Sequence, residues 1–205
     1  MGKRLFDLVF SLAGIVVFSP AMLLIALLIK LTSPGPALYK GARIGQFGNP
    51  FPILKFRTMV FNADMIGGPS TAEDDPRVTR LGRVLRKYKL DELPQLFNVL
   101  KGQMSFVGPR PEVAAEVALY SPEQRKLLRV PPGITDWASM RFHNEGEILK
   151  GSSNPHLTYQ EEIRPEKIRL GLEYIEKRSF WVDLQILFGT IGLILKSRTR
   201  GAGTH

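Results

Sequence analysis

A nearly continuous apolar stretch over residues 5–31 constrains this chain more than any other feature of its sequence. At 1.5 Å per residue, a helix of this length is long enough to cross a bilayer. Lys3 and Arg4 precede the stretch, and Lys30 lies near its end. A cleaved signal peptide is disfavoured, because the apolar run is too long and no small-residue cleavage site closes it. We therefore expect a membrane-attached protein, and a buried helix of a soluble core is the least favoured alternative.

Ser19-Pro20 stands in the middle of this stretch. A proline inside a helix removes a backbone hydrogen bond and bends the helix, so the freed backbone group needs a partner such as the Ser19 hydroxyl. Basic residues flank both ends, so the positive-inside rule favours neither end outside. Two topologies stay open from these residues: a re-entrant helix that breaks at Ser19-Pro20 and returns to the cytoplasmic face, and a kinked helix that spans the membrane.

The charge and composition of the chain narrow its partners. Its net charge of +9 and pI of about 9.9 indicate an anionic partner, either nucleic acid, anionic lipid or a phosphorylated substrate. The lipophilic N-terminal stretch argues against nucleic acid. The absence of cysteine excludes disulfides and thiol catalysis, and only three histidines argue against a histidine-rich zinc site. Aspartate and glutamate are left as metal ligands, which favours Mg²⁺.

The segment 90–111, LDELPQLFNVLKGQMSFVGPRP, joins two adjacent acids to an apolar-periodic stretch and a proline-rich turn. We expect a helix that opens at Asp91, tolerates Pro94 in its first turn and ends at Gly102. The apolar positions that define its period are Leu93, Leu96, Phe97 and Leu100. Asp91 and Glu92 either cap this helix or perform chemistry on a phosphate group, and the pair alone favours the cap.

Cations near the two acids shift the balance towards phosphate chemistry. Arg110 lies between two prolines, whose restricted backbone would present the guanidinium for a bidentate phosphate contact. Residues 77–89 predict a basic amphipathic helix with an arginine at every third position, and Arg86 is the one expected to face Asp91. Lys55 and Arg57 alternate with apolar residues, so both should lie on one face of a strand. A solvated strand face is the alternative for that pair.

The remaining segments predict a fold that is mostly α-helical with a small β hairpin or sheet, an α+β class. Strand-like pieces at residues 37–40 and 52–58 flank a turn at 45–49 and favour a hairpin. Helices are expected over residues 113–128 and 165–177, and residues 180–195 are expected to lie at the membrane interface rather than in the core. The polar segment 62–76, with Gly67-Gly68-Pro69, predicts a loop whose acids at 73–75 are solvated. Residues 130–135 predict a turn.

Residues 135–147 are unusually polar and aromatic for a connector. Such a mixture suits recognition of a base or a sugar, and an ordinary surface loop explains it equally well. The candidate recognition residues are Thr135, Trp137, Arg141, Asn144 and Glu145.

The whole set of segments resembles a known family. The matching stretches are KRLFDL from Lys3, the Ser19-Pro20 pair, SPGPALYKGARIG from Ser33, KFRTM from Lys55, the segment 90–111, PGITDWAS from Pro132, and residues 179–183. In these stretches the chain resembles the monotopic phosphoglycosyl transferases, bacterial enzymes also called polyprenol-phosphate sugar-1-phosphate transferases. Its length is similar to that of their minimal catalytic form.

The resemblance implies a reaction, a location and a division of the chain. Such enzymes move sugar-1-phosphate from a UDP-sugar to undecaprenyl phosphate and release UMP, as the first membrane step of a surface glycan pathway. Residues 1–32 would be the re-entrant helix, residues 33–197 a catalytic domain at the cytoplasmic face of the bacterial inner membrane, in contact with membrane lipids, and residues 198–205 a flexible tail. Whether the protein forms a homodimer stays open.

The resemblance also implies roles for the two acids and their neighbours. Asp91 would be a nucleophile that forms a phosphosugar intermediate, with Mg²⁺ required and held by Asp91 and Glu92. Arg110, Arg86, Lys55 and Arg57 would bind the substrate phosphates. Two other readings stay open: direct transfer with Asp91 as a base, and a basic membrane adaptor without chemistry.

The sequence departs from the family pattern at two places. Gly171 stands where many members carry an aspartate, so an ion pair made by that aspartate is not expected here. The segment DWAS from Asp136 replaces a commoner form with glycine and glutamine. The identity of the sugar therefore does not follow from the resemblance.

Overall fold

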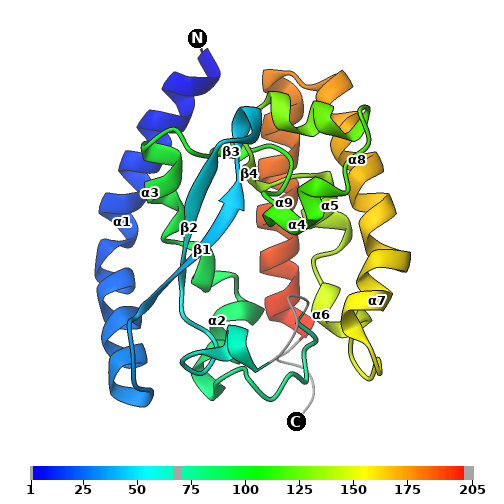
Figure 1. Cartoon of the computed structure of the whole chain (residues 1–205). Coiled ribbons are helices and arrows are strands. Elements are labelled where there is room, and N and C mark those ends of the chain that lie inside the picture. Colours follow the sequence, from blue (N-terminus) through cyan, green and yellow to red (C-terminus); the bar gives the residue numbers. More distant parts are fainter. Residues whose placement is uncertain (1, 67–70, 201–205) are drawn as a thin grey trace.

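The computed structural model describes residues 2–66 and 71–200, and this part of the chain is mostly helical with two small two-stranded sheets (Figure 1). Helix α1 (Gly2–Thr32) forms one edge of the molecule, and α8 (Arg164–Lys177) forms the opposite edge. Helix α9 (Phe180–Arg200) lies between them, and in this view the hairpin of β1 (Leu38–Ile44) and β2 (Pro50–Phe56) lies between α1 and α9. The predicted α+β class is confirmed.

Helix α1 is continuous, which corrects the expected break at Ser19-Pro20. Pro20 lies inside the helix and cannot donate to the carbonyl oxygen of Val16, four residues earlier. The Ser19 hydroxyl donates to that same oxygen at 2.8 Å, so it serves as the expected replacement partner. Within the described residues, α1 is the one helix long and apolar enough to cross a membrane, judged by length and composition.

Polar side chains near the start of α1 bind the rest of the fold. Lys3 forms an ion pair with Asp183 of α9 and donates to the carbonyl oxygen of Val107 at 3.0 Å. Arg4 donates to the carbonyl oxygens of Val99 and Leu100, at 2.6 and 2.9 Å, and so satisfies the C-terminal end of a neighbouring helix. These basic residues were expected to flank a membrane segment, and the structure uses them as tertiary contacts.

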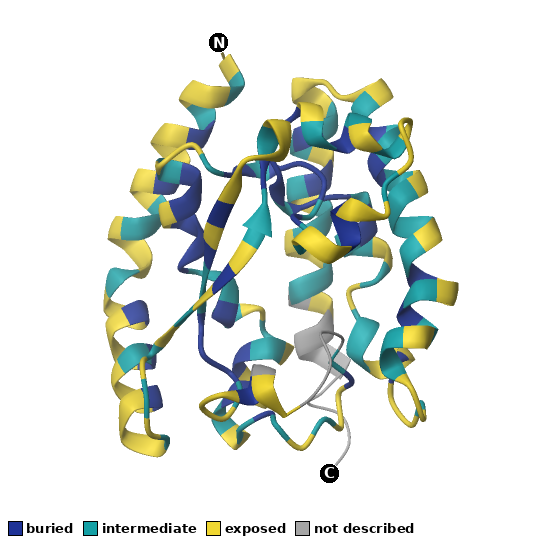
Figure 2. Ribbon diagram, viewed as in Figure 1, coloured by how far each residue is buried: buried dark blue, intermediate teal, exposed yellow. Residues whose placement is uncertain are grey.

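The two faces of α1 differ sharply. Met22, Ile25 and Ile29 are buried and form a core cluster with Phe56 and Leu85. The opposite face is apolar yet exposed along the outer edge of the molecule (Figure 2). Its exposed large residues are Leu5, Leu8, Val9, Phe10, Leu12, Val16, Val17, Phe18, Leu23, Leu24, Leu27, Leu28 and Leu31. An exposed apolar face of this extent is typical of a surface that meets lipid or another protein.

The predicted hairpin is confirmed, with β1 and β2 antiparallel and Gly41 opposite Ile53. A second sheet was not expected. Strand β3 (Ser105–Val107) pairs in parallel with β4 (Gly133–Thr135), and β4 lies within residues 130–135, which were predicted as a turn. The pairing brings two backbones into close approach, because a Cβ on Gly133 would lie 2.2 Å from the backbone nitrogen of Gly108. This sheet fixes the Gly-Pro-Arg-Pro turn that follows β3.

The basic helix is shorter than predicted. Helix α2 (Arg80–Lys87) begins after Thr79, whose hydroxyl accepts from the backbone nitrogen of Gly82 at 2.9 Å. Arg77 lies outside the helix and pairs with Asp75 at 2.7 Å, so this acid of the loop is not simply solvated. The preceding loop contains a 3₁₀ turn, Ala63–Met65, and the predicted Gly67-Gly68-Pro69 lies outside the described residues.

The C-terminal half is built from short helices packed on α8 and α9. The expected helix 113–128 is two pieces, α4 (Ala114–Ala118) and a 3₁₀ helix, Gln124–Arg129. The other short helices are α5 (Trp137–Arg141), α6 (Glu145–Ile148) and α7 (Pro155–Thr158), followed by a π-helical turn, Tyr159–Ile163. The predicted helix 165–177 is confirmed as α8. Gly171 on α8 faces Leu127, whose Cδ2 would lie 2.8 Å from an added Cβ.

Helix α9 is half core and half surface, where an interfacial helix was expected. Ile186 is fully buried and packs with Val107 and Tyr174. Trp181 and Phe188 on the other side are 74% and 69% exposed. The helix continues to Arg200, so residues 198–200 of the expected tail are helical, and residues 201–205 lie outside the described part.

Candidate active site

Asp91 and Glu92 lie on a 3₁₀ turn, Leu90–Glu92, and not at the start of an α-helix as predicted. Helix α3 (Gln95–Leu100) begins three residues after Glu92. The preceding Lys89 has a φ of 55°, a left-handed conformation that turns the chain sharply between α2 and the acids. Leu90 and Leu93 pack against the buried face of α1. The two acids are therefore held between a turn and the apolar helix.

Glu92 is the centre of a charged cluster. Its Oε1 accepts a hydrogen bond from Nζ of Lys55 at 2.9 Å and from a terminal nitrogen of Arg110 at 2.5 Å. Burial by itself would raise the pKa of Glu92, but the charges of Arg110 and Lys55 and the hydrogen bond from Arg110 outweigh it and hold the pKa well below its usual range. Glu92 therefore stays ionised and orients both cations.

Asp91 has the opposite environment. It is 7% exposed, and its Oδ1 has no hydrogen-bond partner among the described residues. Burial first, and then the charge of Glu92, raises the pKa of Asp91, while the charges of Lys55, Lys89 and Arg86 oppose the rise. Adjacent carboxylates with pKa values pushed apart are characteristic of sites where one acid reacts and the other organises.

The expected phosphate-binding cations are only partly brought together. Arg86 on α2 lies near Asp91, whose charge favours the ionised form of Arg86, although burial is the larger effect and lowers its pKa. Arg57 goes elsewhere: its guanidinium donates to the carbonyl oxygens of Pro36 and Ser33, at 2.7 and 3.0 Å. Lys55 and Arg57 are therefore not a joint phosphate-binding face, because β2 ends between them, at Phe56.

The five candidate recognition residues do not converge on one surface. Thr135 bonds the hydroxyl of Thr190 on α9 at 2.7 Å, and Trp137 packs in the core beside Tyr174. Asn144 donates to Glu147 at 3.2 Å, and Arg141 is exposed.

Glu145 is the recognition candidate that acts on the site. It accepts from Lys167 at 2.5 Å, and its charge raises the pKa of Arg110 together with the stronger effect of Glu92 and the weaker one of Asp136. Asp136, which is 2% exposed and caps α5, was not among the predicted residues. No local sequence signal connects it to Arg110.

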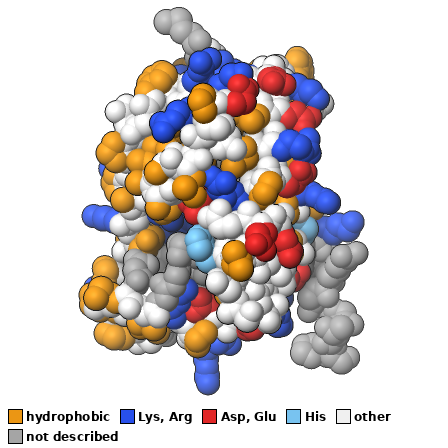
Figure 3. Space-filling model, turned by 45° about the vertical axis from the view of Figure 1, so that its right-hand side comes forward, with side chains coloured by type: hydrophobic (Ala, Val, Ile, Leu, Met, Phe, Trp, Pro, Cys, Tyr) orange, Lys and Arg blue, Asp and Glu red, His pale blue; other side chains and the backbone are white. Residues whose placement is uncertain are grey.

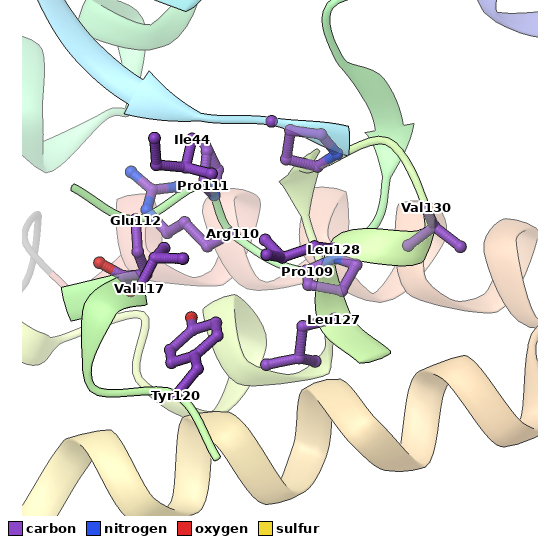
Figure 4. A pocket seen from close by; sticks show the side chains of 12 residues that line it. Ile44, Pro109, Arg110, Pro111, Glu112, Val117, Tyr120, Leu127, Leu128 and Val130 are labelled. Atoms are coloured by element: carbon purple, nitrogen blue, oxygen red, sulfur yellow. The ribbon is translucent and has the colours of Figure 1, made fainter. Parts of the chain in front are cut away.

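A mostly apolar pocket lies behind the turn that carries Arg110 (Figure 4). Arg110 and Glu112 are its charged lining residues, and the side chain of Tyr120 lies on the opposite wall. Asp91 and Glu92 do not line this pocket. Arg110 is therefore the residue that connects this pocket to the acids, through its bond to Glu92.

Thr58 is a neighbour of the site that was not among the predicted residues. Its Oγ1 accepts from Nε of Arg86 at 2.9 Å. The available signal is its position directly after Lys55 and Arg57 in the segment KFRTM.

A metal site made only of protein side chains is absent from the described residues, which contain no group of three or more histidine, aspartate or glutamate side chains placed to hold an ion. Mg²⁺ is often held by one or two carboxylates together with substrate phosphates and water. Asp91 and Glu92 fit such a partial set, because the buried Oδ1 of Asp91 has no other partner.

Comparison with known proteins gives close relatives. A UDP-glucose:undecaprenyl-phosphate glucose-1-phosphate transferase of Caulobacter vibrioides is 42% identical over 199 residues, which cover 94% of this chain and 69% of that protein. The N-acetylgalactosaminephosphotransferase of Aeromonas hydrophila that is named for UDP-N-acetylgalactosamine and undecaprenyl phosphate is 39% identical, over 94% of this chain and 43% of that protein. Exopolysaccharide production protein PSS of Rhizobium leguminosarum bv. phaseoli is 39% identical, over 98% of this chain and 97% of that protein.

The chain thus spans almost all of one relative and less than half of another. The family model described as bacterial sugar transferase matches residues 1–197. The resemblance that the motifs indicate is confirmed, and the chain belongs to the bacterial sugar transferase family.

Proposed function

We propose that this protein transfers sugar-1-phosphate from a UDP-sugar to undecaprenyl phosphate and releases UMP, as the first membrane step of a surface glycan pathway. The observation that carries the proposal is the pair of unlike acids: Asp91 has a buried oxygen with no partner in the described part of the chain, beside Glu92, which holds Lys55 and Arg110. Two relatives are named for this reaction type with UDP-glucose or UDP-N-acetylgalactosamine, and one for exopolysaccharide production.

The reaction divides into two displacements at phosphorus. An ionised Oδ of Asp91 attacks the phosphorus that carries the sugar, the bond from that phosphorus to the bridging oxygen breaks, and UMP leaves with the bridging oxygen. An oxygen of undecaprenyl phosphate then attacks the same phosphorus and breaks its bond to Asp91. Arg110, Arg86 and Lys55 offset the negative charge that grows on the leaving phosphate.

The two acids have separate tasks in this proposal. Glu92 keeps Arg110 and Lys55 in place through its Oε1 and remains ionised throughout. Asp91 is free to form a bond because no donor within residues 2–66 and 71–200 holds its Oδ1. Asp91 and Glu92 would also hold Mg²⁺, which when bound supplies further neutralisation of the diphosphate.

The position of α1 supports monotopic attachment at the cytoplasmic face of the inner membrane. Arg4 at one end of α1 bonds the carbonyl oxygens that end α3, and Arg57 bonds Ser33 just after the other end. Both ends are therefore tied to the same domain, which a single span leading to the far side would not permit. The exposed apolar face of α1 and Trp181 and Phe188 of α9 would lie in the lipid.

The distribution of charge also agrees with a lipid and nucleotide substrate. On the face shown in Figure 3, basic side chains are interspersed with acidic ones. Nucleic-acid-binding proteins usually gather their cations in one patch or stripe.

The test is UMP release from a panel of UDP-sugars, with undecaprenyl phosphate and Mg²⁺, by wild type, Asp91→Ala and the exposed-loop control Asp74→Asn. We expect release by wild type and by the control, and none by Asp91→Ala. Removal of Mg²⁺ with a chelator should abolish release and its return should restore it. If no sugar of a broad panel yields UMP, the transferase proposal fails in favour of a membrane adaptor.

A second measurement separates the covalent route from direct transfer. Wild type is incubated with the accepted UDP-sugar without undecaprenyl phosphate and examined by intact mass spectrometry. The covalent route predicts a mass increase of one sugar phosphate that Asp91→Asn lacks. UMP formed only when the lipid phosphate is present, with no adduct, would instead support direct transfer with Asp91 as a base.

A further inference from the structure

Thr58 connects the end of β2 to α2 through two different groups. It is 7% exposed, and its carbonyl oxygen accepts from the backbone nitrogen and the hydroxyl of Thr79, at 2.9 and 3.2 Å. Thr79 is the residue that caps the start of α2. The Thr58 hydroxyl reaches the other end of the same helix and accepts from Nε of Arg86 at 2.9 Å. Thr58 therefore contacts the residue that caps the start of α2 and also holds the side chain of Arg86 in its last turn.

The backbone of α2 packs so closely on Thr58 at Gly82 that no side chain fits between them. A Cβ on Gly82 would lie 2.0 Å from the carbonyl oxygen of Thr58, so only glycine fits at this point of the helix. The backbone of α2 thus packs directly on Thr58, and the distance from the Thr58 hydroxyl to Arg86 is fixed by the fold.

The bond to Thr58 uses only one corner of the Arg86 guanidinium. Arginine has five N–H donors in a planar fork, of which Nε carries one. Arg86 makes no other hydrogen bond within residues 2–66 and 71–200, so its two terminal nitrogens remain available. Burial lowers the pKa of Arg86 and the charge of Asp91 opposes this effect, so the guanidinium lies near the reacting acid.

We propose that Thr58 is a positioning residue, which holds Arg86 through Nε so that the two terminal nitrogens face the diphosphate of the nucleotide sugar at Asp91. This inference rests on the proposed function. Without the hydroxyl, the side chain of Arg86 can adopt several rotamers. Fixing it in one rotamer then costs conformational entropy each time the transition state forms. The loss should fall mainly on kcat, because the charge on the leaving phosphate grows in the transition state.

The test is a double-mutant cycle measured by UMP release, with the UDP-sugar that wild type uses best. Thr58→Val keeps the shape of the side chain and removes the acceptor, and we expect kcat/KM to fall about 10- to 100-fold. Thr58→Ser keeps the hydroxyl and should stay within about threefold of wild type. Thr158→Val on α7, which removes a hydroxyl bonded to Ser152, is the matched control and should be unchanged.

The decisive comparison uses Arg86→Lys, which keeps the charge and removes the fork. In that background, Thr58→Val should cost less than about twofold, because Thr58 acts through Arg86. Equal losses in both backgrounds would overturn the inference, and so would full activity of Thr58→Val. Absence of UMP release by wild type itself would instead refute the proposed function, so the two failures are distinguishable.

If Thr58→Val does not fold, the wild-type protein gives the answer. The Nε–H resonance of Arg86, assigned by its loss in Arg86→Lys, should exchange slowly with water when it is bonded to Thr58. Exchange as fast as that of an exposed arginine such as Arg80 would overturn the inference.

Discussion

Neutralising Asp91 should raise the free energy of unfolding, whereas neutralising Glu92 should lower it. Asp91→Asn removes a charge that burial and the neighbouring Glu92 disfavour, and the desolvation penalty of a buried polar group is about 1–3 kcal/mol, or more for a charged one. We therefore expect Asp91→Asn to be more stable than wild type by about 2 kcal/mol at pH 7. For a chain of 205 residues this corresponds to a Tm increase of about 4–8 °C. The same variant should be inactive.

Glu92→Gln should do the reverse. It leaves Lys55 and Arg110 without their shared acceptor, and breaking a buried ion pair from one side costs about 3–5 kcal/mol. Because the side chains of Lys55 and Arg110 are 22% and 30% exposed, solvent screens part of the loss. We expect a cost of about 3 kcal/mol, which corresponds to a Tm decrease of about 6–12 °C.

The pH dependence of the two variants provides the sharper test. The pKa of folded Asp91 is raised above its unfolded value of about 3.9, so its contribution to stability is complete below pH 3.9 and is lost as pH rises through the folded pKa. The advantage of Asp91→Asn should therefore appear only on raising the pH. The pKa of folded Glu92 is depressed, so its contribution is present above about pH 4.3 and is lost as pH falls through the folded pKa.

The assay is thermal unfolding of purified protein in one detergent at a fixed scan rate, from pH 4 to pH 8, with chelator present and substrates absent. The exposed-loop variant Asp74→Asn is the control and should follow wild type at every pH. A lower Tm for Asp91→Asn at pH 7, or a gain that does not change with pH, would refute the assignment of Asp91 as the destabilising acid.

Three further substitutions test packing and buried polarity by the same unfolding assay. Gln95 is fully buried with both side-chain polar atoms unpartnered, so Gln95→Met should raise the unfolding free energy by about 1–2 kcal/mol; a loss of stability would show that the amide has a partner. Gly171→Ala would place a Cβ 2.8 Å from Leu127 and should cost about 1–3 kcal/mol, whereas an unchanged Tm would mean that Leu127 moves aside freely. Tyr174→Phe removes the 2.7 Å bond to Asp183 and should cost about 1–3 kcal/mol, and a neutral effect would show that Lys3 alone satisfies this acid.

The elements that the sequence predicted correctly are those formed by residues close together in the chain. The hairpin follows from alternation and a turn, and α8 follows from helical period, so both could be predicted from their own residues. The β3–β4 pair could not, because each strand has three residues and the pairing joins Ser105 to Gly133 across the chain. Such short strands have no period of their own, and the prolines and glycine at residues 131–133 favour a turn where β4 begins.

The candidate site shows the same division. Lys55, Arg86 and Arg110 were expected near the acids. In the structure Lys55 and Arg110 bond Glu92, and Arg86 lies close enough to Asp91 for the charge of Asp91 to raise its pKa against the larger effect of burial. Arg57 was expected beside Lys55 because residues two apart share a strand face. Strand β2 ends before Arg57, and the guanidinium of Arg57 donates to the carbonyl oxygens of Pro36 and Ser33.

The structure separates the candidate recognition residues for a different physical reason. Polar and aromatic residues can serve a ligand or a core, and the sequence does not distinguish the two uses. Thr135 and Trp137 serve the packing of α5 and α9, and Glu145 contributes charge near Arg110. The sugar therefore cannot be assigned from this segment.

The ion pair between Lys3 and Asp183 has a consequence for biosynthesis. The two residues are 180 positions apart, so the first helix to leave the ribosome finds its partner only when the last helix is being made. At about 5–20 residues per second, the wait is about 9–36 s. During that interval Lys3 has not yet met Asp183. Arg4 also waits, because α3, whose last carbonyl oxygens it bonds, is completed only about halfway through the interval. An apolar helix that waits this long for its partners needs another surface to cover it, and a lipid bilayer would provide one.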